Sequence, residues 1–179
     1  MQLAKAAGCK VIGIAGGPEK CAWVTGTAKA DACIDYKSQN VWRELARLAP
    51  EGLDVVFENV GGEILEAAIM NLALGARIVM CGAISNYEAD PREQRGVRFL
   101  LNLAMKRALM KGFIVLDYEA RYPEATRALE ALMSSGALHA AVDLQEGFDN
   151  IPATLNRLFD GRNLGKQLLK IADLPLPVP

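Results

Sequence analysis

The sequence has a single histidine, His139, and four cysteines, none of which form a Cys-x-x-Cys pair. Protein-bound zinc usually needs several histidine or cysteine ligands at short, defined spacings, so we expect no metal site. His139 also has no serine or cysteine in a nucleophile motif such as Gly-x-Ser-x-Gly, which argues against a hydrolytic triad. Cysteines without a disulfide pattern favour a reduced protein, and we expect a cytoplasmic location.

The sequence also has no marked excess of positive or negative charge. The 20 Lys and Arg residues nearly balance the 21 Asp and Glu residues, and both kinds are spread along the chain. There is therefore no basic stripe of the kind that binds nucleic acid. The first ten residues contain no apolar signal core, and the longest apolar stretch, 65–84, is interrupted by Asn71, Gly75 and Arg77. We expect neither a nucleic-acid nor a membrane partner.

Short β-branched runs alternate with longer helical patterns over most of the chain, which is typical of β-α-β units with a mostly parallel sheet. The near-continuous apolar run at 53–57 favours a sheet with helices on both faces. We therefore predict a doubly wound α/β fold. The expected strands are Lys10–Ala15, Ala32–Asp35, Leu53–Glu58, Ala76–Cys81 and Gly112–Leu116; the expected helices are Pro18–Ala28, Val41–Ala49, Glu63–Leu72, Val97–Met110 and Glu119–Ser135.

The alternation of strands and longer helices that marks the first part of the chain changes after Gly136. A strand at 140–144, a helix at 151–159 and a strand at 166–171 are expected there, and they could belong to a different domain. We predict three segments: an incomplete nucleotide-binding domain at 1–140, a segment at 141–173 that would pack on a further catalytic domain, and a disordered proline-rich tail at 174–179.

Ligands of open α/β sheets bind beyond the carboxyl ends of the strands. The first expected strand ends at Ala15 and is followed by Gly16 and Gly17, without the acid that would bind the ribose hydroxyls of NAD. Lys20 lies in the first turn of the next helix, where a cation typically costs about 0.3–1 kcal/mol and a phosphate partner would reverse that cost. Alternatively, the glycines form only a turn and Lys20 is a solvated surface charge.

Three further strand ends carry candidate residues. Asn59 precedes a glycine pair and could bind a ribose or nicotinamide group, although the segment also fits a tight turn. Tyr87 closes a loop of small residues that starts at Cys81. A tyrosine phenol is not a ready base at neutral pH, so a hydrogen-bond donor is the more plausible role. Tyr87 could equally be a surface tyrosine. Tyr36 could stack near an adenosine, or simply begin a polar loop.

Six segments occur in one order: GIAGGPEK, IDYK, FENVGGE, IVMCGAISNY, GFIV and GRNLGK. Together they resemble the NADP-dependent alkenal or enone double-bond reductases, the prostaglandin and leukotriene reductase branch of the zinc-independent medium-chain dehydrogenases. The resemblance runs from about Gln2 to Ile171 and implies a Rossmann domain. Because six ordered motifs are far more specific than any one, they outweigh the local alternatives above.

The resemblance also implies roles. Lys20 would contact the 2′-phosphate of NADP(H), and Tyr36 the phosphate region on the adenosine side. Hydride would pass from NADPH to the β-carbon of an α,β-unsaturated ketone or aldehyde, with Tyr87 as the catalytic hydrogen-bond donor to the enolate oxygen. The cofactor-binding set is Gly16, Gly17, Lys20, Tyr36, Asn59, Cys81, Gly82, Ala83, Ile84, Ser85, Tyr87, Phe113, Ile114, Val115 and Asn163.

The sequence departs from the family pattern at its start. Family members carry a catalytic domain, a strand and a glycine-rich turn before the helix that here begins at Met1. We therefore expect a Rossmann sheet that lacks its first, central strand, and an isolated chain that is inactive. The alternatives are a non-catalytic NADP-binding or interaction module, a quinone oxidoreductase of the same superfamily and, more distantly, a methyltransferase. The substrate would be a small enone, enal or quinone, and the resemblance is compatible with a homodimer.

Overall fold

The computed structural model describes residues 1–87, 90, 92 and 95–173. Its contacts divide into two compact units: unit 1 combines Met1–Cys33 with the chain from Arg127 onward, and unit 2 is Ile34–Thr126. No helix among the described residues is long and apolar enough to cross a membrane. The tail predicted at 174–179 lies outside the described residues.

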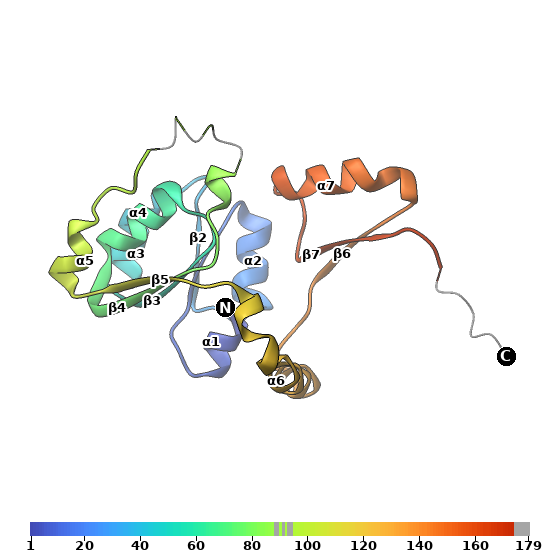
Figure 1. The fold of residues 1–179 in the computed structure, drawn as a ribbon, viewed down its shortest axis with the longest axis horizontal. Helices are drawn as coiled ribbons and strands as arrows, with labels where there is room; N and C mark the ends of the chain where they lie inside the picture. The colour runs from blue at the N-terminus through green and yellow to red at the C-terminus, as the bar shows by residue number, and fades with distance from the viewer. Residues whose placement is uncertain (88–89, 91, 93–94, 174–179) are drawn as a thin grey trace. The chain divides into compact units, whose positions relative to one another are not determined.

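Unit 2 is built on a three-stranded parallel sheet in the order β3-β4-β5 (Figure 1). Ile78 is the register partner of both Val56 and Met110, so the middle of β4 lies between its two neighbours. The elements of this unit are α3 (Val41–Leu48), β3 (Leu53–Glu58), α4 (Gly62–Met70), β4 (Leu72–Met80), η1 (Ile84–Asn86), α5 (Leu101–Lys106), β5 (Leu109–Gly112) and η2 (Val115–Arg121).

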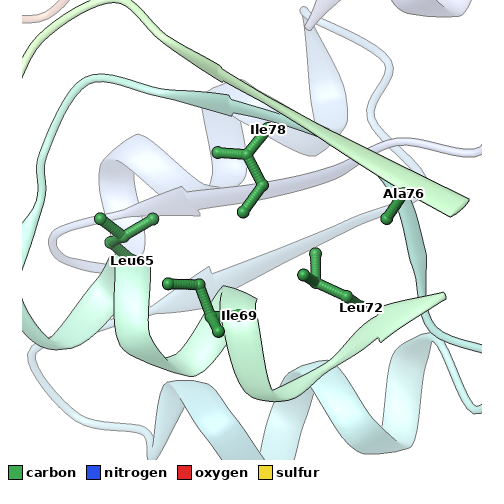
Figure 2. Close-up of a cluster of buried hydrophobic side chains, with 5 residues drawn as sticks. All are labelled: Leu65, Ile69, Leu72, Ala76 and Ile78. Atoms are coloured by element: carbon green, nitrogen blue, oxygen red, sulfur yellow. The ribbon is translucent and has the colours of Figure 1, made fainter. Parts of the chain in front are cut away.

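The core of unit 2 lies between helix α4 and strand β4 (Figure 2). Leu65 and Ile69 are four positions apart and so share one face of the helix, which they bury against side chains from β4. Ile69 is fully buried, and the cluster is completed by partly buried side chains from β3, α5 and β5. The five buried members are Leu65, Ile69, Leu72, Ala76 and Ile78.

Unit 1 begins with α1 (Gln2–Ala6), β1 (Ile12–Ala15) and α2 (Pro18–Gly26), followed by β2 (Ala32–Asp35), which pairs with β1 and carries the chain into unit 2. Pro18 occupies the start of α2, where its missing N–H costs no hydrogen bond. The interior of this region is a small cluster of Val11, Val24 and Ala30.

Helix α6 (Tyr122–Ser134) carries the chain back to unit 1. There β6 (Val142–Glu146) and β7 (Lys166–Lys170) form a separate parallel pair, connected through η3 (Phe148–Asn150) and α7 (Ile151–Phe159). Arg157 on α7 holds this pair by an ion pair of 2.7 Å with Asp143. The Gln2 side chain exchanges two hydrogen bonds with the backbone of His139, so α1 is tied to the segment that leads into β6.

The ladders β1-β2 and β3-β4-β5 are separate, and no described strand pairs with both β1 and β3.

Several expected elements are displaced. The strand predicted at Gly112–Leu116 is wrong, because β5 ends at Gly112 and η2 follows from Val115. The helix predicted at Val97–Met110 is limited to Leu101–Lys106, since Arg107 takes a left-handed conformation with φ of 49° and ends it. Strand β4 begins at Leu72 rather than Ala76, with a register irregularity between Leu53 and Val55 of β3.

Candidate functional site

The carboxyl ends of β3, β4 and β5 form one edge of the unit 2 sheet, because the three strands are parallel. The loops that leave this edge are connected through their backbones. Cys81 N–H donates to the Glu58 carbonyl at 2.8 Å, and Phe113 N–H donates to the Met80 carbonyl at 3.1 Å. Three of the predicted segments, those that begin at Asn59, Cys81 and Phe113, therefore start side by side.

The first loop is held by a buried carboxylate. Glu58 is 3% exposed, and its Oε1 accepts hydrogen bonds from Val60 N–H at 2.5 Å and from Gly61 N–H at 2.8 Å. A carboxylate at the start of α4 also meets the positive end of the helix dipole. Glu58 thus fixes the turn and leaves the Asn59 side chain exposed at its tip.

Glu58 was not among the residues predicted from the sequence. The available signal was a charged residue that ends an otherwise apolar strand, immediately before an Asn-x-Gly-Gly turn.

The loop from Cys81 to Tyr87 closes onto that turn. Ile84 N–H donates to the Asn59 carbonyl at 3.0 Å, and Ser85 N–H donates to the Val60 carbonyl at 2.9 Å. Gly61 has φ of 76°, and a Cβ there would lie 3.1 Å from Ser85 Oγ. The glycine is therefore required both by its backbone conformation and by the close approach of the two loops.

Tyr87 ends this loop and is 67% exposed. Its phenol lies over Gly82, because a Cβ built on Gly82 would be only 3.0 Å from Tyr87 Oη. The absence of a side chain at Gly82 thus leaves room for the phenol oxygen.

An apolar surface follows β5. The Phe113 ring lies 6.1 Å from the ring of Phe57 and 6.1 Å from that of Tyr118, measured between centroids. Phe113 and Tyr118 line an open apolar hollow of about 380 Å³, and Ile114, next to Phe113 in the sequence, is 63% exposed. A flat ring could pack on such a surface. The hollow is lined by Val79, Lys111, Gly112, Phe113, Val115 and Tyr118.

Four of the predicted residues belong to unit 1. Gly17 has φ of 94° at the start of α2, with no atom within 4 Å of the position that a Cβ would take. Lys20 extends toward the turn after α7, since its Nζ lies 3.8 Å from the Cβ position of Gly161. Among the residues that the structure describes, no carboxylate pairs with Lys20. The open space and the cation at the start of a helix fit a phosphate.

Asn163 lies in the turn toward which Lys20 extends, but its side chain is engaged locally, with Nδ2 donating to the Gly165 carbonyl at 2.9 Å. Tyr36 follows β2 in unit 2 and is 48% exposed. Its turn is held by Asp35, whose carboxylate accepts from Lys37 N–H at 3.0 Å and from Ser38 Oγ at 2.8 Å.

The predicted residues are divided between the two units. Whether the two groups bind one ligand stays a prediction. Unit 1 holds Gly16, Gly17, Lys20 and Asn163; unit 2 holds Tyr36, Asn59, Cys81, Gly82, Ala83, Ile84, Ser85, Tyr87, Phe113, Ile114 and Val115.

Acidic, histidine and cysteine side chains do not gather into a metal-binding group of three or more within residues 1–87, 90, 92 and 95–173. The predicted lack of a metal site stays a prediction.

Parallel strands that alternate with helices, with glycine turns at their carboxyl ends, define a doubly wound α/β protein of the Rossmann class. The family model described as "Zinc-binding dehydrogenase" matches residues 1–131, and the chain belongs to that family.

Among solved structures, CurA of Vibrio vulnificus in complex with NADPH superposes with a TM-score of 0.90 at 37% identity, over 97% of this chain and 52% of that one. The 2-alkenal reductase (NADP(+)-dependent) of Nicotiana tabacum is 38% identical over 96% of this chain and 50% of its own length. The NADPH-dependent curcumin reductase of Escherichia coli (strain K12) is 34% identical over 96% and 51%. The chain thus spans about half the length of the curated relatives it matches.

These similarities confirm the predicted family relationship and the predicted α/β fold. The individual roles assigned to the site residues stay predictions.

Proposed function

We propose that this chain is the cofactor-binding portion of an NADPH-dependent reductase that acts on the C=C bond of α,β-unsaturated aldehydes or ketones. The observation that carries the proposal is the similarity to an NADPH-bound structure along 97% of the chain. A relative whose name specifies 2-alkenal reduction with NADP(+) supports the substrate class.

The residues present fit this cofactor. Lys20 offers a cation in the first turn of α2, beside the open space at Gly17, and no acid stands at the end of β1 to repel a 2′-phosphate. In unit 2, the Phe113 and Val115 side chains offer an apolar surface for the nicotinamide ring. When bound, NADPH would supply the hydride that adds to the β-carbon of the substrate.

Tyr87 would donate its phenolic hydrogen to the carbonyl oxygen of the substrate. As the β-carbon is reduced, negative charge develops on that oxygen, and a preorganised donor stabilises it. The position of the phenol over Gly82 supports this role, because the missing side chain at Gly82 leaves room for the hydroxyl of a residue that is 67% exposed.

The activity test uses the longest protein that contains this chain, with a panel of 2-alkenals, cyclic enones and quinones. We expect NADPH to be oxidised in the presence of alkenals or enones. If quinones alone support turnover, the substrate class changes; if NADPH binds but no substrate is reduced, the chain is a non-catalytic binding module and the enzyme proposal fails.

Cofactor choice is tested by Lys20→Ala. A charge-assisted hydrogen bond is typically worth about 1.5–3 kcal/mol, so NADPH should bind roughly 10–100-fold more weakly. NADH, which lacks the 2′-phosphate, should change by less than about threefold on the same basis. The matched control is Lys166→Ala on β7, which should alter neither affinity. Equal weakening of NADPH and NADH would remove Lys20 from the 2′-phosphate.

The donor role is tested by Tyr87→Phe in the active protein. Loss of one donor to a developing oxyanion typically lowers turnover by about 10²–10³-fold. NADPH affinity should stay within about twofold, because the hydroxyl is assigned to the substrate. Unchanged turnover would leave Tyr87 with a structural role only.

A further inference from the structure

Two cysteines that lie 12 positions apart in the sequence face each other in unit 1. Cys21 is in the first half of helix α2 and Cys33 is in strand β2, and their Sγ atoms are 2.8 Å apart. Both side chains are half-buried, whereas Cys9 and Cys81 are exposed. Of the four cysteines, Cys21 and Cys33 are therefore the pair that the fold brings into sulfur contact.

The surroundings hold both residues in place. Cys33 packs against the buried cluster of Val11, Val24 and Ala30, and Val24 comes from the same helix as Cys21. The first turn of α2 is closed by a backbone hydrogen bond from Cys21 N–H to the Gly17 carbonyl at 3.2 Å. Helix and strand thus present their sulfurs to one another from anchored positions.

We propose that Cys21 and Cys33 form a redox-modification site, at which a reversible disulfide joins α2 to β2. A disulfide bond is about 2.05 Å long, so the two sulfurs need to approach by less than about 1 Å. Thiols held this close react as neighbours at a high effective concentration.

The oxidant belongs to the class of small-molecule disulfides, for which glutathione disulfide is the probe. One protein thiolate attacks the probe, forms a mixed disulfide and releases one glutathione thiolate. The second protein thiolate then attacks the mixed disulfide and releases the second glutathione. Two electrons pass from the protein sulfurs to the probe, and the two thiol protons appear on the two glutathione molecules.

The site adjoins the residues assigned to the phosphate of the cofactor. Cys21 directly follows Lys20 and lies in the helical turn that begins after Gly17, at the start of α2. The inference does not rest on the proposed reductase function, because its test measures only sulfur chemistry and stability.

The experiment equilibrates the 179-residue chain with mixtures of reduced glutathione and glutathione disulfide, then blocks the remaining thiols. Trypsin cleaves after Lys20, Lys29 and Lys37, so Cys21 and Cys33 fall in separate peptides, 21–29 and 30–37. We expect the disulfide-linked pair of these peptides to be the main oxidised product. It should form with an effective concentration at least about tenfold higher in native buffer than in guanidinium chloride.

Variants separate the pair from the exposed thiols. Cys9→Ser and Cys81→Ser should leave the linked peptides unchanged, whereas Cys21→Ser should abolish them and leave Cys33 glutathionylated. Oxidation of the wild-type chain should raise its melting midpoint by about 5–10 °C, because the bond closes a loop in the unfolded state. The proposal is overturned if the effective concentration is the same in guanidinium chloride, or if the disulfides are spread over all four cysteines.

Discussion

The buried carboxylate of Glu58 should determine the stability of the turn that carries Asn59. Its Oε1 accepts two backbone N–H groups, from Val60 and Gly61, at 2.5 and 2.8 Å. Each buried donor left without a partner costs about 1–3 kcal/mol, so Glu58→Ala should lower the free energy of unfolding by roughly 2–5 kcal/mol. Glu58→Gln keeps an oxygen acceptor without the charge and should cost only about 1–2 kcal/mol.

Urea unfolding of the 179-residue chain and its variants measures these differences from the midpoint at constant slope. Glu51→Ala is the matched control, because Glu51 is exposed and its truncation should stay within about 0.5 kcal/mol. A Glu58→Ala variant as stable as Glu51→Ala would refute the role of the carboxylate. A Glu58→Gln variant as unstable as Glu58→Ala would show that the charge, rather than the acceptor, holds the turn.

Three other substitutions have defined outcomes. Gly82→Ala places a Cβ 3.0 Å from Tyr87 Oη and should displace the phenol. Steady-state kinetics should show a turnover reduced toward that of Tyr87→Phe, with NADPH affinity retained. Wild-type turnover would contradict the role of Gly82. Ile69→Ala empties a fully buried site and should cost about 2–5 kcal/mol in urea unfolding, and a loss below about 1 kcal/mol would contradict the core assignment. Hydrogen bonds, first from Arg157 and then from Gln145 and Leu164 N–H, lower the pKa of Asp143 from 3.8 to about 2. The stabilisation is therefore present above pH 3.8 and is lost as the pH falls through about 2. Asp143→Asn should therefore flatten this part of a plot of urea midpoint against pH, and an unchanged slope would exclude the ion pair as its cause.

Secondary structure was predictable where the local pattern decides it. The strands Ala32–Asp35 and Leu53–Glu58 and the helix Ile151–Phe159 have the predicted bounds, because their apolar runs end at turn residues. The predicted strand at Gly112–Leu116 is wrong because its position depends on a distant partner: the ladder with β4 ends where Met80 meets Gly112. No local pattern in the sequence contains that register.

The approach of the loops at the ends of β3 and β4 was predictable from the sequence, whereas the roles of the candidate site residues stay predictions. Glycines next to Asn59 and before Tyr87 mark loops that must approach one another, and the structure brings these loops together. The role of Glu58 was not predicted, because its hydrogen-bond partners are backbone N–H groups. Every residue except proline carries such a group, so no sequence motif marks the partners. The proximity of Cys21 and Cys33 could not be predicted from the sequence either, because it depends on the tertiary packing of α2 and β2.

The most direct test of the central claim follows the hydride itself. The active protein is incubated with a 2-alkenal and with NADPH that carries deuterium at the transferable position of the nicotinamide ring, and the product is analysed by mass spectrometry and NMR. The proposed function predicts a saturated aldehyde with deuterium on the β-carbon. Deuterium on the former carbonyl carbon of an allylic alcohol would contradict it, as would the absence of any transfer.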